Sequence, residues 1–133
     1  MKILLIGANG TIGSAVDKEL SQRHEIIRIG RNSGDFQVDI SDSASIRKLF
    51  EQTGKFDALV CAAGNVTFAP LSEMTEESFA LGLKDKLMGQ VNLVRFGIDH
   101  VRDEGVFLLT AGIFSQRAPA GASAAAMVNG MRN

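Results

Sequence analysis

The sequence has one cysteine, no tyrosine, no tryptophan and almost no excess of charge of either sign among its 133 residues. With Cys61 alone the chain cannot form an internal disulfide, and a single cysteine fits a reducing, cytoplasmic setting. The net charge of −1 argues against a nucleic-acid or membrane surface as partner. The apolar runs fall far short of the ~20 residues of a membrane span, and the first leads straight into glycines, unlike a signal peptide. We therefore expect a single globular domain over residues 1–133.

The N-terminal residues carry the strongest pattern in the chain. Residues 3–6 form a continuous apolar run, which is typical of a central strand buried on both faces of a parallel sheet. Gly7, Gly10 and Gly13 follow with the spacing G-x-x-G-x-x-G. Such glycines permit a tight turn, the approach of a diphosphate to the backbone, and close packing of the next helix, whose N-terminus favours the anion. The alternative is an ordinary glycine-rich turn between a strand and a helix.

The rest of the chain alternates strands and helices. Further strands are expected at residues 24–29, 36–38, 58–62 and 106–109, and helices at residues 10–22, around Ile46, Leu49 and Phe50, and from about residue 121. Thr75 should cap a long helix whose apolar stripe runs from Phe79 to Val101. This alternation predicts an α/β fold, a Rossmann-type doubly wound parallel sheet with strand order 3-2-1-4-5. A ligand crevice is expected between the first and fourth strands.

Five features occur together in the order of a known family. They are the Gly7-Gly10-Gly13 loop, Gly30-Arg31-Asn32-Ser33 after the second strand, Asp39 after the third, Cys61-Ala62-Ala63-Gly64 after the fourth, and the long helix before the fifth. With these features the chain resembles the short-chain dehydrogenase/reductase family, in a divergent branch. The resemblance covers nearly the whole chain but only the nucleotide-binding part of the family's fold. The family's later helix and two further strands have no counterpart in this sequence.

The residue after the second strand indicates which nicotinamide cofactor is expected. NAD binders usually place an acidic residue there, about 20 residues after the glycine loop, to bind the ribose hydroxyls. This chain has Arg31, whose guanidinium can hold a 2′-phosphate in a bidentate contact, and Ser33 adds a hydroxyl. We therefore expect NADP(H) as the cofactor, and not NAD(H). The alternative for Arg31 is a solvated surface arginine.

The resemblance implies further cofactor contacts. Asp39 is similar to the family's aspartate that bonds the adenine amino group, although an Asx-type lead into a helix is nearly as good an interpretation. Ala62, Ala63 and Gly64 match the family's Asn-Ala-Gly turn, where small residues let the adenosine ribose lie against the backbone, and Ala62 departs from the pattern. The cofactor-binding residues implied in this way are Gly7, Asn9, Gly10, Thr11, Ile12, Gly13, Arg31, Ser33, Asp39, Ile40, Ala62, Ala63 and Gly64.

The catalytic part of the family pattern does not match. The family reduces carbonyls with a tyrosine proton donor, a lysine four residues later, a serine and an asparagine, whereas this chain has no tyrosine. Alignment on Pro119 puts Ala111, Ala124 and Val128 at the serine, tyrosine and lysine positions. Lys86, the last lysine of the chain, falls at the asparagine position. The family's usual mechanism is therefore not available to this sequence.

Two residues remain as candidate catalytic groups. Thr110 ends the fifth strand, and the alternative to a catalytic role is that its hydroxyl bonds the local backbone. Lys86 is equally compatible with an inward, catalytic position and with a solvated one. The two histidines lack metal-ligand spacing, so no metal site is expected. Three functions stay open: an NADP-dependent oxidoreductase acting on a small carbonyl or alcohol, a catalytically silent NADP(H)-binding sensor or regulatory protein, and a truncated remnant.

A second copy of the chain is the partner that the sequence favours. The apolar strand at residues 106–109 would lie at the edge of the sheet with unpaired backbone groups, which isolated domains avoid. The stripe of the long helix would offer a second apolar surface. We therefore expect a homo-oligomer, with a fold-back of residues 121–133 over the edge strand as the alternative.

Overall fold

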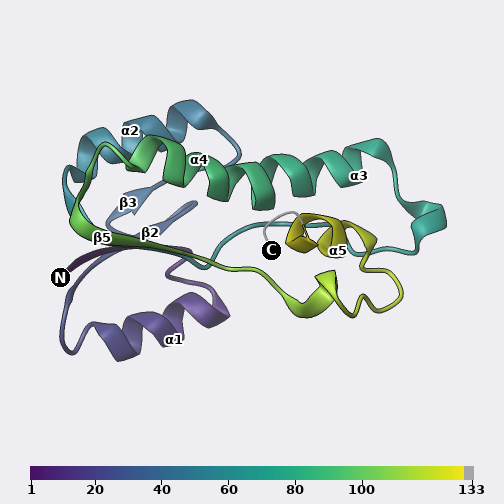
Figure 1. The fold of residues 1–133 in the computed structure, drawn as a ribbon, viewed down its shortest axis with the longest axis horizontal. Helices are drawn as coiled ribbons and strands as arrows, with labels where there is room; N and C mark the ends of the chain where they lie inside the picture. Colours follow the sequence, from purple (N-terminus) through teal and green to yellow (C-terminus); the bar gives the residue numbers. More distant parts are fainter. Residues whose placement is uncertain (131–133) are drawn as a thin grey trace.

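A computed structural model of the chain describes residues 1–130 and contains one five-stranded parallel sheet (Figure 1). Its strands run in the order β3-β2-β1-β4-β5, so the predicted Rossmann-type topology is confirmed. The strands are β1 (Lys2–Ile6), β2 (Glu25–Gly30), β3 (Phe36–Gln37), β4 (Phe56–Cys61) and β5 (Val101–Leu109). The central strand β1 places Ile6 opposite Ile29 of β2 and Cys61 of β4, which aligns the carboxyl ends of these three strands.

Helices cover both faces of the sheet. They are α1 (Thr11–Leu20), α2 (Ser43–Thr53), α3 (Glu76–Leu81), α4 (Met88–Gly97) and α5 (Ser123–Gly130), with the π-helical segment η2 (Gly82–Leu87) joining α3 to α4 and 3-10 turns η1 (Leu71–Glu73) and η3 (Ile113–Ser115). Figure 1 shows α1 on one side of the sheet, α2 and α4 on the other, and α5 beside α3 beyond the strand ends. Within residues 1–130 no helix is long and apolar enough to cross a membrane.

The core forms because both faces of β1 are apolar, as the run at residues 3–6 predicts. Leu4 and Ile6 point to the α2 side, where they pack with Phe50 and with Leu93 of α4. Ile3 and Leu5 point to the opposite side, where Val16 and Leu20 of α1 cover them. Burial of each leucine-sized side chain contributes about 1.5–3 kcal/mol, so this strand anchors both layers of helices.

The predicted long helix differs from the observed one. Thr75 caps it as expected, since its hydroxyl accepts a hydrogen bond from the Ser78 amide at 3.1 Å. The apolar spacing predicts a helix as far as Val101, which is wrong: α4 ends at Gly97 and Val101 begins β5. Val101 pairs with Phe56 of β4, and a shift of register then separates this pair from the regular ladder that starts at Val106. Val101, a half-buried strand residue, therefore matches the apolar spacing of the preceding helix only by coincidence.

Candidate functional site

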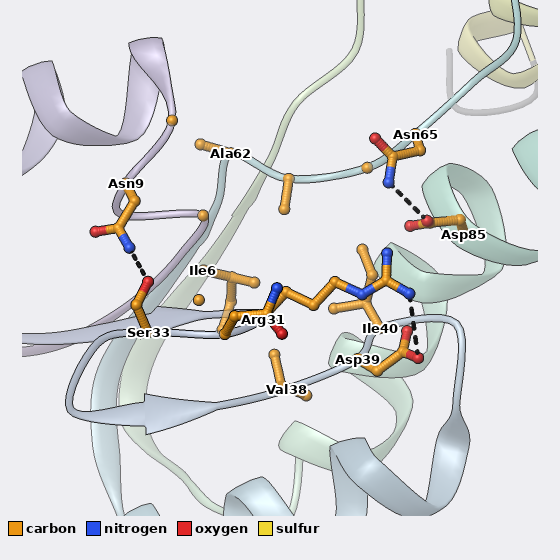
Figure 2. A pocket seen from close by; sticks show the side chains of 16 residues that line it. Ile6, Asn9, Arg31, Ser33, Val38, Asp39, Ile40, Ala62, Asn65 and Asp85 are labelled. Carbon is orange, nitrogen blue, oxygen red and sulfur yellow. Dashed lines mark hydrogen bonds and ion pairs between the residues drawn. The ribbon is translucent and has the colours of Figure 1, made fainter.

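A cavity of about 480 Å³ lies at the carboxyl ends of β1 to β4 (Figure 2). The predicted cofactor residues that line it are Gly7, Asn9, Gly10, Arg31, Ser33, Asp39, Ile40, Ala62, Ala63 and Gly64. Thr11, Ile12 and Gly13 form the first turn of α1 directly after this wall. The strand ends meet here because Gly7 donates a backbone hydrogen bond to Ile29, and Ala62 donates one to Ile6, each at 2.8 Å. The cavity therefore occupies the predicted crevice between the first and fourth strands.

The three glycines of the first loop differ in the space around them. Gly7 has a φ of +84°, and a Cβ there would lie 2.8 Å from the carbonyl oxygen of Ala62. A Cβ on Gly13 would lie 1.8 Å from the Gly7 carbonyl oxygen, so only glycine lets α1 pack on the loop. At Gly10 the nearest atom would be 3.4 Å away, an ordinary contact. The fold requires glycine at the first and third positions, whereas Gly10 keeps the backbone open at the cavity wall.

The end of the cavity beside β2 carries the polar groups expected for a phosphate. Asn9 donates a hydrogen bond from its amide nitrogen to the Ser33 hydroxyl, which ties the glycine loop to the loop after β2. The Arg31 guanidinium lies 3.8 Å from a carboxyl oxygen of Asp39 and is mostly exposed. Figure 2 shows the Arg31 side chain extended across the cavity towards Asp39. The Arg31 guanidinium is therefore within the cavity, and its one ion pair among residues 1–130 is weak and exposed to solvent.

Asp39 has the structure of the Asx lead-in that the sequence left open. Its Oδ1 accepts hydrogen bonds from the backbone amide of Ser41 at 3.0 Å and from the Ser41 hydroxyl at 2.6 Å. These bonds hold the pKa of Asp39 below its usual value, and the charges of Arg31 and Lys84 lower it further. Asp39 therefore has a structural role in the turn that leads into α2, and this role does not depend on a ligand.

Sequence reasoning missed Asp85, an acidic residue in the cavity wall. It lies in the π-helical segment η2, is 6% exposed, and accepts a hydrogen bond from the side-chain amide of Asn65 at 3.2 Å. Both residues line the cavity beyond the Ala62–Gly64 turn (Figure 2). The only signal in the sequence is an acidic residue inside the apolar stripe, between Leu83 and Leu87.

Sequence reasoning also missed Gln90, which is 0% exposed in α4. Its amide nitrogen donates to the carbonyl oxygens of Thr110 at 3.2 Å and Ala63 at 3.4 Å, and its amide oxygen accepts from the Thr110 backbone amide at 3.1 Å. One side chain thus satisfies the backbone just where β4 and β5 separate. Thr110, a predicted catalytic candidate, is held here through its main chain.

The other catalytic candidate, Lys86, lies against the turn after β4. A Cβ on Gly64 would lie 2.8 Å from the Cγ of Lys86, so the lysine stem is packed on that turn and the side chain is half-buried. At the positions that the resemblance gives to the tyrosine and the lysine, Ala124 and Val128 are fully buried in α5. The structure therefore places packed aliphatic groups there, and no polar side chain stands in for them at those two positions.

Among residues 1–130 no three histidine, cysteine, aspartate or glutamate side chains gather as a metal-binding group. The candidate site consists of the glycine loop, the Arg31 end and the Asp85 side chain brought in by η2, and Gln90 of α4 bonds the backbone of Ala63 in the cavity wall.

Comparison with known proteins gives a consistent result. The model of the NAD dependent epimerase/dehydratase family matches residues 3–127. Elsinochrome reductase 1 of Elsinoe fawcettii is 28% identical over 85% of this chain and 51% of its own length. The crystal structure of the protein lin1944 from Listeria innocua is 52% identical with a TM-score of 0.96, covering 98% of this chain and 65% of that one. A small-chain dehydrogenase in complex with NADPH is 25% identical with a TM-score of 0.88, covering 98% of this chain and 59% of that one.

The chain spans about half the length of the curated relatives it matches, 51% of the first and 42% of a versicolorin reductase of Emericella nidulans. The matches confirm the family resemblance that the five sequence features indicate. The chain belongs to the NAD dependent epimerase/dehydratase family and, with these relatives, to the short-chain dehydrogenases/reductases.

Proposed function

We propose that this chain binds NADP(H) in the cavity at the strand ends. The observation that carries the proposal is Arg31, a mostly exposed cation at the end of β2, with the Asn9–Ser33 hydrogen bond beside it. A carboxylate at this position would repel a 2′-phosphate, whereas a guanidinium attracts it. The likeness to a small-chain dehydrogenase in complex with NADPH supports the same cofactor.

The residues present fit such a dinucleotide. Gly10 exposes its backbone at the cavity wall, and the N-terminus of α1 directs free amide groups and a partial positive charge to the same place, which suits a diphosphate. Arg31 and Ser33 would hold the 2′-phosphate, and Ala62, Ala63 and Gly64 would leave room for the adenosine ribose. When bound, the cofactor would supply a hydride donor or acceptor.

We further propose that the whole protein is an oxidoreductase that uses this cofactor on a small carbonyl or alcohol. Its family membership supports this activity. The catalytically silent NADP(H) sensor is a second candidate, because Ala124 and Val128 put buried aliphatic groups where the family has its proton donor and lysine. If the chain is active, Lys86 or Thr110 is the candidate for supplying the proton to the carbonyl oxygen.

The test is a titration of NADPH and NADH against the protein. Because the chain has no tryptophan and no tyrosine, nucleotide fluorescence can be followed with little protein background. We expect NADPH to bind at least about tenfold more tightly than NADH, a difference of roughly 1.4 kcal/mol. Arg31→Glu should remove this preference. Arg23→Glu makes the same charge change in the turn after the C-terminal end of α1, outside the lining of the cavity, and should keep it.

Equal affinity for the two nucleotides in the unmodified protein would refute the NADP assignment. With binding established, NADPH oxidation in the presence of a panel of small carbonyl compounds separates the two functions. Turnover that falls in Lys86→Ala or Thr110→Val supports the oxidoreductase, and binding without turnover supports the sensor.

A further inference from the structure

The cofactor cavity contains a buried carboxyl group that the glycine loop and Arg31 do not explain. Asp85 is nine-tenths buried yet lines the cavity, and it reaches the wall from η2, an element outside the strand ends. We propose that Asp85, held by Asn65, accepts a hydrogen bond from the amino group of the cofactor's adenine and so selects adenine over other bases. This inference rests on the proposed binding of NADP(H).

The position of Asp85 is fixed by its surroundings. Asn65 donates to its Oδ2 at 3.2 Å, and the turn at Gly64 packs against Lys86, the next residue in the chain. A carboxyl group offers about four lone-pair sites, so the bond from Asn65 leaves capacity for a second donor. Burial of a carboxyl group costs free energy unless the group is hydrogen-bonded. A ligand that donates to Asp85 would bind more tightly because the carboxyl group is already held in position before the ligand arrives.

The apolar part of the cavity suits a flat base next to Asp85. Val38 and Ile40 line it and are almost fully buried, and Ile40 lies close under α4, where a Cβ on Gly89 would be 2.9 Å from its Cγ1. Figure 2 shows Asp85 and Asp39 on the same side of the cavity, with the end of the Arg31 side chain between them. A ring stacked on the two aliphatic side chains would present its polar edge to this acidic end of the cavity.

Asp39, the aspartate that the family resemblance assigns to adenine, is less suited to this contact. Two hydrogen bonds from Ser41 occupy its Oδ1, and its Oδ2 faces the Arg31 guanidinium. The Asp39 carboxyl group therefore already serves the turn before α2 and lies beside the cation that we assign to the 2′-phosphate, so a base edge at Asp39 would compete with both for its lone pairs. Among residues 1–130, the hydrogen-bond partner of the Asp85 carboxyl group is the neutral side-chain amide of Asn65.

The experiment compares NADPH with its analogue that carries hypoxanthine in place of adenine. The analogue has a carbonyl oxygen where adenine has the amino group, so it would set an acceptor against the Asp85 carboxyl oxygen. We expect the unmodified protein to prefer NADPH by about tenfold, as expected for loss of a hydrogen bond to a charged group. Asp85→Asn should bring the two affinities close together, because an amide both donates and accepts.

The matched control is Asp39→Asn, whose amide oxygen can still accept from Ser41 and keep the turn. This variant should retain the preference for adenine. A preference that survives Asp85→Asn and disappears in Asp39→Asn would overturn the assignment and give the role to Asp39. Equal affinities in the unmodified protein would overturn the inference while leaving NADP(H) binding intact, whereas a failure of NADPH to bind at all would overturn the proposed function itself. Urea unfolding of each variant identifies any loss caused by misfolding.

Discussion

At the scale of single residues, the three glycines of the first loop fall into two groups: Gly7 and Gly13 are required by the fold, whereas Gly10 would be explained by a ligand. Gly7 and Gly13 face backbone atoms of the chain at distances no side chain permits. Gly10 has room for a Cβ. Its backbone is extended, with φ −75° and ψ 174°, a conformation that residues with side chains also adopt. The glycine at this position therefore has no structural cause within residues 1–130, and a ligand that approaches the backbone would supply one.

We predict that Gly10→Val folds but loses NADPH binding. The substitution removes a fair N-cap from α1, so its cost in free energy of unfolding should be no more than about 1 kcal/mol. NADPH affinity should fall at least tenfold, because the valine would occupy the space that the diphosphate needs. Circular dichroism with urea titration measures the fold, and nucleotide fluorescence measures binding.

Gly13→Ala is the matched control for the same loop. Its Cβ would lie 1.8 Å from the Gly7 carbonyl oxygen, so this small change should destabilise the protein far more than the valine at residue 10. A Gly10→Val variant that binds NADPH like the unmodified protein would show that the loop is only a turn.

At the scale of elements, α4 fixes the ends of β4 and β5 through Gln90. The three backbone groups that it bonds belong to Ala63 and Thr110, where the two strands have already parted and cannot satisfy each other. The same two residues lie at the turn and the strand end that frame the crevice. A single buried amide therefore couples the packing of a helix to the shape of the candidate site.

We predict that Gln90→Leu lowers the free energy of unfolding by about 2–4 kcal/mol, because it leaves buried amide and carbonyl groups without partners. Gln22→Leu is the control, since Gln22 lies exposed in the turn after α1 and donates from its side-chain amide to the carbonyl oxygen of Lys18 in that helix. That change should stay within about 0.5 kcal/mol. Urea denaturation of both variants gives the comparison, and a Gln90→Leu protein as stable as Gln22→Leu would contradict this account.

The sequence predicts those elements whose signals are local. The strand β1, its glycine loop and the Thr75 cap each depend on residues a few positions apart, and all three are in the structure as expected. The π-helical segment and the start of β5 at Val101 are not predicted, because apolar spacing records which residues are buried and not how the backbone is bonded. Asp85 and Gln90 bond to partners 20 and 27 residues away, a relation that only the folded chain reveals.

At the scale of the whole molecule, the sheet has an apolar edge. β5 is the last strand in the sheet order, and Val106 and Leu108 on it are 49% and 53% exposed. Among the strands that residues 1–130 form, β4 alone pairs with β5, so backbone amide and carbonyl groups along the other side of β5 are available for another strand. Isolated domains usually cover such an edge or place charges on it. The first part of β5 carries exposed charges at Arg102, Asp103 and Glu104, whereas its last part exposes the aliphatic side chains of Val106, Leu108 and Leu109.

We predict that the 133-residue chain forms a homodimer through the β5 edge. A two-fold contact would place the same strand of each copy side by side, so one surface would satisfy itself without a second binding patch. Sedimentation at micromolar concentrations should show a dimer. Leu108→Lys, which puts a charge in the middle of that contact, should yield a monomer, whereas Leu71→Lys, an equally apolar exposed site on η1, should remain a dimer.

A monomer in the unmodified chain, or a dimer broken by Leu71→Lys and not by Leu108→Lys, would rule out the β5 edge as the interface. Most of the segment in the fold-back alternative forms α5, which lies beside α3 beyond the strand ends and leaves Val106 and Leu108 of β5 exposed, so this described part does not cover the edge. Residues 131–133, the rest of that segment, lie outside the described residues.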